Sequence, residues 1–207
     1  MRDPSATRQS LLDAGRAEFA RHGLAGGRTD RIAQAAGASK ERIYAYFGSK
    51  EGLFEAVVDD ALEDLLDLVP MPATGLDSPA GLVDYVARVA EHHRRHPRLM
   101  RLVQWEALER SGQTDPETPR ARKYRAKAAA LGERLGIPPE EAAPLLVLLI
   151  LLAAGPQAMS NLAGAITGLP PEAAAAAVSQ RAARAAPAAV GSALASRAPT
   201  TGDPPPT

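Results

Sequence analysis

Alternation of apolar and polar residues, the pattern of a half-buried β-strand, is almost missing from this chain. The sequence is instead rich in Ala, Leu, Arg and Glu, which are strong helix formers. Glycine and proline interrupt it at intervals, for example at Gly37, Gly48, Pro97 and Gly136. The stretches between these interruptions predict an all-α fold of about nine helices.

The sequence argues against cysteine-dependent sites, secretion and insertion into a membrane. None of the 207 residues is cysteine, which excludes thiolate catalysis, cysteine-ligated zinc and iron–sulfur clusters. The residues after Met1 are polar, unlike the apolar core of a secretory signal. The longest apolar run, residues 142–155, contains Pro144 and is shorter than the roughly 20 residues that span a bilayer. We therefore expect a soluble, cytoplasmic protein that does not associate with membranes.

Charged side chains are unevenly distributed, although the net charge is zero. Residues 1–50 carry nine basic and five acidic residues, and residues 51–85 carry nine acidic and no basic ones. Residues 86–136 carry twelve basic and six acidic residues. Such asymmetry is a hint that the basic N-terminal segment binds a polyanion.

The first 54 residues contain two short predicted helices in close succession. Residues 29–36 and 40–47 are separated by a turn in which Gly37 offers a positive φ and Ser39 an N-cap for the second helix. A longer helix precedes them and stops at Gly23. Two short helices with such a turn form a helix-turn-helix, whose second helix enters the major groove of DNA. We therefore predict an N-terminal three-helix DNA-binding domain over residues 1–54.

The second short helix is expected to bury Ile43 and Phe47 and to turn its remaining side chains outward. Basic side chains there reach guanine edges or phosphates, tyrosine hydroxyls bind phosphate oxygens, and a glutamate accepts from cytosine. The predicted DNA contacts are Arg28, Thr29, Lys40, Glu41, Arg42, Tyr44, Tyr46 and Lys50. The alternative is a plain three-helix packing unit with a solvated basic face. Five of the eight aromatic residues lie in this domain, which favours DNA binding.

The run Ile43-Tyr44-Ala45-Tyr46-Phe47-Gly48-Ser49-Lys50-Glu51-Gly52-Leu53-Phe54, with the preceding residues from Thr7 onward, resembles the N-terminal domain of the TetR/AcrR family of bacterial transcriptional regulators. The resemblance implies a helical homodimer, usually a repressor that a small molecule releases from its operator. It also implies DNA contacts at Thr29, Lys40, Arg42, Tyr44, Tyr46 and Lys50. The chain has Gly27-Arg28 where the family often has threonine, and Glu41-Arg42 where many members have Gly-Thr. We therefore expect its operator sequence to differ.

Residues 55–197 are predicted to form a helical effector-binding and dimerisation domain, and residues 198–207, rich in proline and threonine, a disordered tail. One helix over residues 51–69 is expected to belong to both domains. Ligand sites are mostly apolar with a few polar groups. The predicted effector-binding residues are Tyr85, Met100, Trp105, Tyr124 and Met159, although each is individually more typical of plain core.

A helix over residues 140–166 is predicted to be apolar on every side, which requires cover on every side. A second subunit supplies that cover most economically, with the alanine-rich residues 171–195 as the neighbouring helix. The predicted dimer contacts are Leu148, Leu151, Leu152, Leu162 and Val178. The alternative is a helix buried inside a monomer.

Two charged features have plain interpretations. His92 and His96 have the spacing of metal ligands, but cations at the end of a helix are the favoured explanation, so no metal is predicted. The basic run 120–127 is interpreted as a solvated face, ahead of a ligand rim or a further DNA contact.

The sequence therefore predicts a DNA-binding transcriptional regulator whose partners are a double-stranded operator, a second copy of itself and a small-molecule effector. The alternative is a ligand-independent activator or architectural DNA-binding protein. We expect no catalytic residues and no cofactor, because the chain lacks a recognisable Ser/His/Asp constellation and a glycine-rich phosphate loop.

Overall fold

The computed structural model describes residues 3–110 and 117–195, with side chains placed as far as residue 191. These ranges contain ten helices and no strand, which confirms the all-α prediction. The helices are α1 (Pro4–Gly26), α2 (Thr29–Ala36), α3 (Lys40–Phe47), α4 (Lys50–Leu68), α5 (Pro79–Arg95), α6 (Pro97–Glu109), α7 (Pro119–Leu135), α8 (Pro139–Ala158), α9 (Ser160–Thr167) and α10 (Pro171–Ala195). The predicted tail, residues 198–207, lies outside the described residues.

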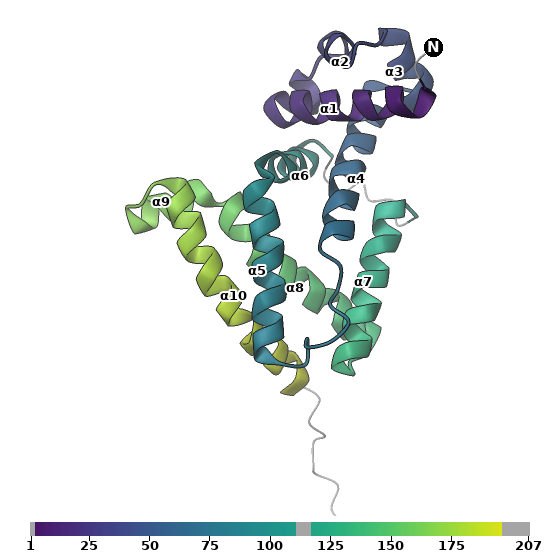
Figure 1. Ribbon diagram of the computed structural model, residues 1–207. Helices are drawn as coiled ribbons and strands as arrows, with labels where there is room; N and C mark the ends of the chain where they lie inside the picture. The colour runs from purple at the N-terminus through teal and green to yellow at the C-terminus, as the bar shows by residue number, and fades with distance from the viewer. Residues whose placement is uncertain (1–2, 111–116, 196–207) are drawn as a thin grey trace, which may run out of the picture.

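Figure 1 shows a head of α1–α3 above a body of α5–α10, with α4 running from one to the other. In the head, α1 is broken at Gly23, whose φ of +67° is accessible to glycine at little cost. The rings of Phe19 and Phe54 meet edge to face with centroids 5.2 Å apart, which ties α1 to α4. Ile32 and Ile43 are fully buried beside them. Ser39 stands at the N-cap of α3, but its hydroxyl caps no helical N–H, contrary to the prediction.

The predicted single helix over residues 140–166 is wrong, because the structure divides it into α8 and α9. Met159 leaves the helical conformation with φ −113° and ψ 27°. Pro156 lies within the last turn of α8 and has no N–H to donate, so this turn is weakened where the helix ends. The division adds one helix to the expected number.

Charged side chains on two sides of α4 hold it between head and body. From α1, the guanidinium of Arg16 contacts the carboxylates of Asp60 at 2.6 Å and Asp64 at 2.7 Å. From α7, the guanidinium of Arg120 lies 3.2 Å from the carboxylate of Asp59 on α4. The ammonium of Lys123 contacts two further carboxylates of α4, those of Glu63 at 3.3 Å and Asp67 at 3.1 Å. The prediction of one continuous helix over residues 51–69 is thus confirmed, since α4 runs without a break from Lys50 to Leu68.

The same contacts show that the basic run 120–127 is not simply a solvated face. Arg120, Lys123 and Lys127 recur every three or four residues, so they lie on the side of α7 that faces α4. Only the side chains between them, such as Arg122 and Arg125, are exposed.

In the body, α8 packs against α5, α7 and α10. One side of α5 is buried in the core, with Val86 fully enclosed and Tyr85 only 2% exposed. Ser78 caps α5 by accepting a hydrogen bond from the N–H of Gly81 at 3.1 Å.

Candidate DNA-binding surface and ligand cavity

One side of α3 faces solvent, and the predicted DNA contacts gather on it. Ile43 is fully buried and Phe47 half-buried, so these two side chains seat α3 on the head. The five predicted contacts within α3, namely Lys40, Glu41, Arg42, Tyr44 and Tyr46, are all exposed. We call these five residues the α3 surface.

Weak contacts within the head orient the α3 surface. The ammonium of Lys40 lies 2.8 Å from the carboxylate of Asp30, and the hydroxyl of Tyr46 donates to the carbonyl of Pro4 at 3.3 Å. The guanidinium of Arg42 lies 3.4 Å from the hydroxyl of Thr7. Exposed contacts of this kind contribute little stability, so DNA can replace them at small cost.

The other three predicted DNA contacts differ from one another. Arg28 is exposed just before α2, and its N–H donates to the carboxylate of Glu18 at 2.9 Å. Thr29 is only 8% exposed, so its side chain is part of the head's interior rather than its surface. Lys50 is half-buried and its ammonium donates to the carbonyl of Ala25 at 3.1 Å, which joins the start of α4 to the end of α1.

Ala45 is an exposed residue of α3 that the sequence analysis did not select. It follows Glu41 by one turn, so it lies between the long side chains of the α3 surface. A small apolar side chain there suits contact with a thymine methyl group. The spacing of four residues from Glu41 was the signal for it in the sequence.

The body contains a partly open cavity of about 100 Å³ between α4, α5, α6, α7 and α8. Its apolar lining consists of Leu62, Leu65, Leu66, Val89, Met100, Val103, Leu149, Ile150 and Ala154, and its polar lining of Tyr85, His93, Tyr124 and Lys127. Three of the five predicted effector-binding residues therefore meet in one place. Trp105 instead packs against Gly23 of the head, and Met159 is 57% exposed at the end of α8. Neither of these two residues lines the cavity.

The cavity lining also contains His93, which was not predicted, and Lys127, which belongs to the basic run for which a ligand rim was only the alternative to a solvated face. His93 is only 3% exposed, and neither ring nitrogen has a hydrogen-bond partner among the described residues. Burial lowers the pKa of His93 to about 4, so its ring is neutral at pH 7. Burial also lowers the pKa of Lys127 to about 8, and its ammonium donates to the carbonyl of Val69 at 2.6 Å.

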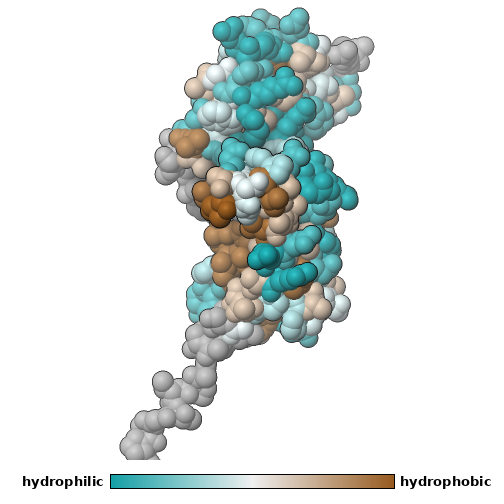
Figure 2. All heavy atoms as spheres, turned by 90° about the vertical axis from the view of Figure 1, so that its left-hand side faces the viewer, coloured by the Kyte–Doolittle hydropathy of each residue, from teal (hydrophilic) through white to brown (hydrophobic). Residues whose placement is uncertain are grey.

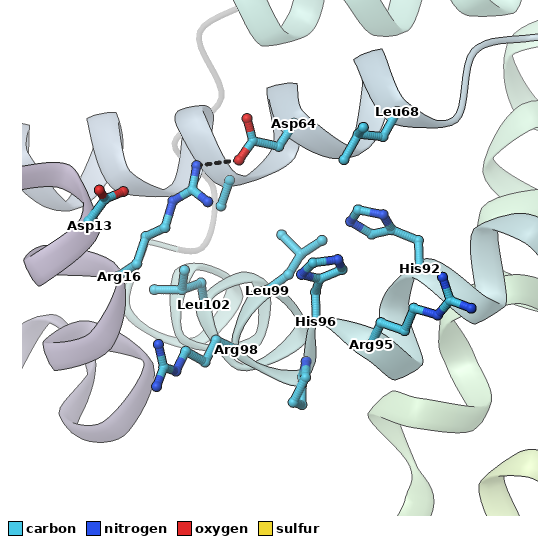
Figure 3. Close-up of a pocket in the computed structure, with 12 residues that line it drawn as sticks. Asp13, Arg16, Asp64, Leu68, His92, Arg95, His96, Arg98, Leu99 and Leu102 are labelled. Carbon is cyan, nitrogen blue, oxygen red and sulfur yellow. Dashed lines mark hydrogen bonds and ion pairs between the residues drawn. The ribbon is translucent and has the colours of Figure 1, made fainter. Parts of the chain in front are cut away.

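A second hollow, the junction groove, lies where the head meets the body and has a volume of about 490 Å³. Figure 3 shows Arg16 and Asp64 at one end of it and His92 at the other. The rings of His92 and His96 stack with centroids 4.3 Å apart. No group of three metal-binding side chains occurs in the part of the chain that the structure describes.

Apolar side chains are exposed on α8 and α9. The most exposed large ones are Val147 at 56%, Leu151 at 60%, Leu162 at 51% and Ile166 at 75%, and Leu148 is 40% exposed. We call these five residues the apolar face. Figure 2 shows brown, hydrophobic residues gathered over α9 and beside it. Of the other predicted dimer contacts, Leu152 and Val178 are half-buried.

By length and composition α8 also passes as a membrane span, with a mean hydropathy of 1.7. It is the one such helix within the described residues. However, its buried side includes Leu145, Leu146 and Leu149, and α8 packs against α5, α6, α7 and α10 of the body. The structure therefore uses α8 as a core helix with one side left open.

Comparisons with known proteins agree with this architecture. Residues 11–57 match the model of bacterial regulatory proteins of the tetR family, and residues 81–190 match a tetracyclin repressor-like C-terminal domain. The HTH-type transcriptional repressor SCO4008 of Streptomyces coelicolor is 40% identical over 156 residues, which are 74% of this chain and 78% of that protein. The HTH-type transcriptional repressor NicS of Pseudomonas putida is 30% identical over 63% of this chain and 59% of its own.

The fold is also similar to that of a transcriptional regulator of known structure. The crystal structure of the transcriptional regulator SCO4942 of Streptomyces coelicolor superposes with a TM-score of 0.62 at 32% identity. The superposition covers 85% of this chain and 96% of that one.

Proposed function

Because the chain belongs to the TetR family of bacterial regulatory proteins, we propose that it is a cytoplasmic, homodimeric repressor. It binds a palindromic operator through α3 and releases it when a small molecule fills the cavity of the body. The members of this family are DNA-binding regulators, and the relatives SCO4008 and NicS are named as repressors.

The α3 surface is the observation that carries this proposal. Its side chains include two cations, two phenol groups and a carboxylate on one exposed side of a helix of eight residues. A helix of this width fits the major groove, where such groups bind base edges and flanking phosphates. Arg28, exposed at the start of α2, adds a positive charge for the backbone of the DNA.

The apolar face supports the homodimer. Two copies related by a two-fold axis would cover this face with itself and form a four-helix arrangement from α8 and α10 of each subunit. The same axis would place two copies of α3 on one side of the DNA. A palindromic operator requires them to be about 34–36 Å apart, which is one turn of the duplex.

The cavity supports control by a ligand, since helices that line it also touch the head. Leu62 and Leu65 of α4 line the cavity, and Asp60 and Asp64 of the same helix pair with Arg16 of α1. A ligand that displaces α4 therefore changes the position of the head. Ligand and DNA would then oppose each other with a coupling free energy of about 1–3 kcal/mol.

An electrophoretic shift assay on genomic fragments tests the proposal, run over a range of salt concentrations. A regulator retains a few specific fragments as salt rises, whereas non-specific binding weakens equally on all of them. An architectural protein would show no preference among fragments. A protein that is monomeric and binds no duplex at moderate salt would overturn the proposal.

A further inference from the structure

The cavity contains a cation without a counter-anion. The ammonium of Lys127 lies 5.6 Å from the centre of the Tyr85 ring and donates one hydrogen bond, to the carbonyl of Val69. Two of its three N–H groups remain available. No carboxylate within the described ranges lies within ion-pairing distance of it, whereas Lys123, one turn earlier, contacts both Glu63 and Asp67.

His93 is a second polar group of the cavity with unused hydrogen-bonding capacity. Both ring nitrogens of His93 are buried without a hydrogen bond to any described residue, although a neutral imidazole has one donor and one acceptor. The cavity has no acidic side chain in its lining. A buried polar group without a partner is destabilising, so a molecule that supplies acceptor atoms here would bind favourably.

The cavity is small and partly open to solvent, so an occupant somewhat larger than its volume can extend into the opening. About 100 Å³ is less than the roughly 150 Å³ of a protein cavity that holds benzene. The lining includes Met100, whose flexible side chain adapts to a slightly larger occupant. Aliphatic side chains from four helices form the rest, so most of the occupant must be apolar.

We propose that the effector is a small monocarboxylate, whose single ring or short chain lies among the leucines and whose carboxylate binds Lys127 and the N–H of His93. This inference rests on the proposed function, because it names the chemical class of the ligand that controls DNA binding. The charge of the cavity also excludes a lipophilic cation, which would meet Lys127 without any carboxylate to balance it.

Three probes of similar size test the charge. Benzoate, benzamide and benzylamine have the same ring and carry a negative, zero and positive charge at pH 7. We expect calorimetric titration of the full-length protein to give at least about tenfold tighter binding of benzoate than of benzamide, with no detectable binding of benzylamine. Equal affinity for benzoate and benzamide, tighter binding of benzylamine, or no binding of benzoate at millimolar concentration would each overturn the proposal.

Two matched lysine variants identify the group responsible. Lys127→Met keeps the length of the side chain and removes its charge, so it should abolish the preference for benzoate over benzamide. Lys123→Met removes the same charge from the same helix but outside the cavity, and should preserve that preference. If Lys127→Met retained the preference, Lys127 would not be the carboxylate-binding group. Thermal unfolding of each variant shows whether it is folded.

The pH dependence is a second, independent readout. Binding of benzoate should weaken as pH rises through about 8, because Lys127 loses its proton there. The titrating groups around it in the cavity lining are Tyr85, Tyr124 and His93, and none of these three changes charge near pH 8. Arg88 is a further charged neighbour of Lys127. A flat affinity between pH 7 and pH 9 would contradict the assignment.

A separate measurement distinguishes the ligand class from the proposed function. Operator binding is measured first without ligand and then with benzoate. Loss of the operator complex supports both proposals. Tight, Lys127-dependent binding of benzoate with an unchanged operator complex supports the monocarboxylate site and rejects its role as a control on DNA binding.

Discussion

The carboxylate of Glu109 accepts a hydrogen bond from the N–H of Leu24 at 2.6 Å, so the last turn of α6 in the body caps the broken end of α1 in the head. The next N–H, of Ala25, donates to the same carboxylate at 3.3 Å. Arg101 and Trp105 precede Glu109 by eight and four residues and touch the same segment. Arg101 donates to the carbonyl of Ala20 at 2.6 Å, and Trp105 packs on Gly23. One stripe of α6 thus holds the end of α1.

This stripe lies on the helix that also lines the cavity through Met100 and Val103. We therefore expect Glu109→Ala to release the end of α1 and to weaken the coupling between ligand and DNA. Loss of the charged hydrogen bonds should reduce the free energy of unfolding by about 1.5–3 kcal/mol. Urea denaturation measures this change, and hydrogen exchange at Leu24 and Ala25 locates it.

Glu133→Ala on α7 is the control, because Glu133 is exposed and no hydrogen bond or ion pair is recorded for it among the described residues. That variant should unfold like the unmodified protein. Unchanged exchange at Leu24 in Glu109→Ala would show that the contact has no part in joining head to body.

Gly23 should be intolerant of any side chain. A Cβ atom on it would lie 2.7 Å from the Glu109 carboxylate and 2.8 Å from the Trp105 ring, and its φ of +67° disfavours other residues. Gly136 has a similar φ of +65° but open space around its Cα. Gly136→Ala should therefore cost about 1–2 kcal/mol for backbone strain, and Gly23→Ala about 1–3 kcal/mol more for crowding. If urea denaturation gave the same loss of unfolding free energy for both variants, the side chains of Glu109 and Trp105 would be able to move away from the added methyl group at no cost.

The local patterns of the sequence predicted the head well. Ile43 and Phe47 recur at a spacing of four residues, and this spacing alone determines which side of α3 faces inward. Gly37 and Gly23 mark the turns because a positive φ is a local requirement. The resulting exposure of Arg42 and Tyr44 follows from the same helical geometry.

Contacts between distant parts of the chain were not predictable in this way. Trp105 was assigned to the pocket as a large apolar group, yet the orientation of α6 directs it to Gly23 and directs Met100 to the cavity. That orientation depends on packing against α1 and α8, which no local spacing encodes. Lys127 was grouped with the solvated charges for the same reason, since its role depends on the position of α4.

His93 should make the stability of the protein depend on pH. Its pKa is lowered by burial from 6.5 to about 4 in the folded protein, so the unfolded chain binds more protons between these values. Stability is therefore fully present above about pH 6.5 and is lost as pH falls toward 4, by on the order of 3 kcal/mol. The charged neighbours on its own helix, His92 and His96, act in the same direction.

Urea denaturation from pH 7.5 to 4.5 measures this loss, and His93→Phe should reduce its slope because the titrating group is removed. His22→Phe is the control, since His22 is exposed in the head. If the unfolding free energy fell equally with pH in the unmodified protein and in His93→Phe, groups other than His93 would cause the loss of stability in acid.

The apolar face should be the site of dimerisation. Leu151→Glu would place a charge in a dry interface, where burial of an unpaired carboxylate is strongly unfavourable. Light scattering should then give about half the mass of the unmodified protein, and operator affinity should fall because two copies of α3 no longer bind together. Leu68→Glu makes the same change at a 67% exposed leucine on α4 and should leave the dimer intact. If the Leu151→Glu variant were still a dimer, the apolar face would not be the dimer interface.

Arg42 should contact DNA bases and contribute to sequence specificity, whereas Lys50 should contribute equally to the binding of every DNA sequence. Arg42 is exposed in the first turn of α3 and has one long contact, to Thr7, that DNA can displace. Arg42→Ala should cost about 1–3 kcal/mol on the operator and less on random duplex, which reduces the specificity ratio. Lys50→Ala should weaken both duplexes equally, because Lys50 supports the end of α1 through Ala25 rather than facing a base. Fluorescence anisotropy at two salt concentrations separates these outcomes.

If Arg42→Ala lost the same binding free energy on operator and on random DNA, Arg42 would be a phosphate contact. Base recognition would then depend on Glu41, Tyr44 and Ala45.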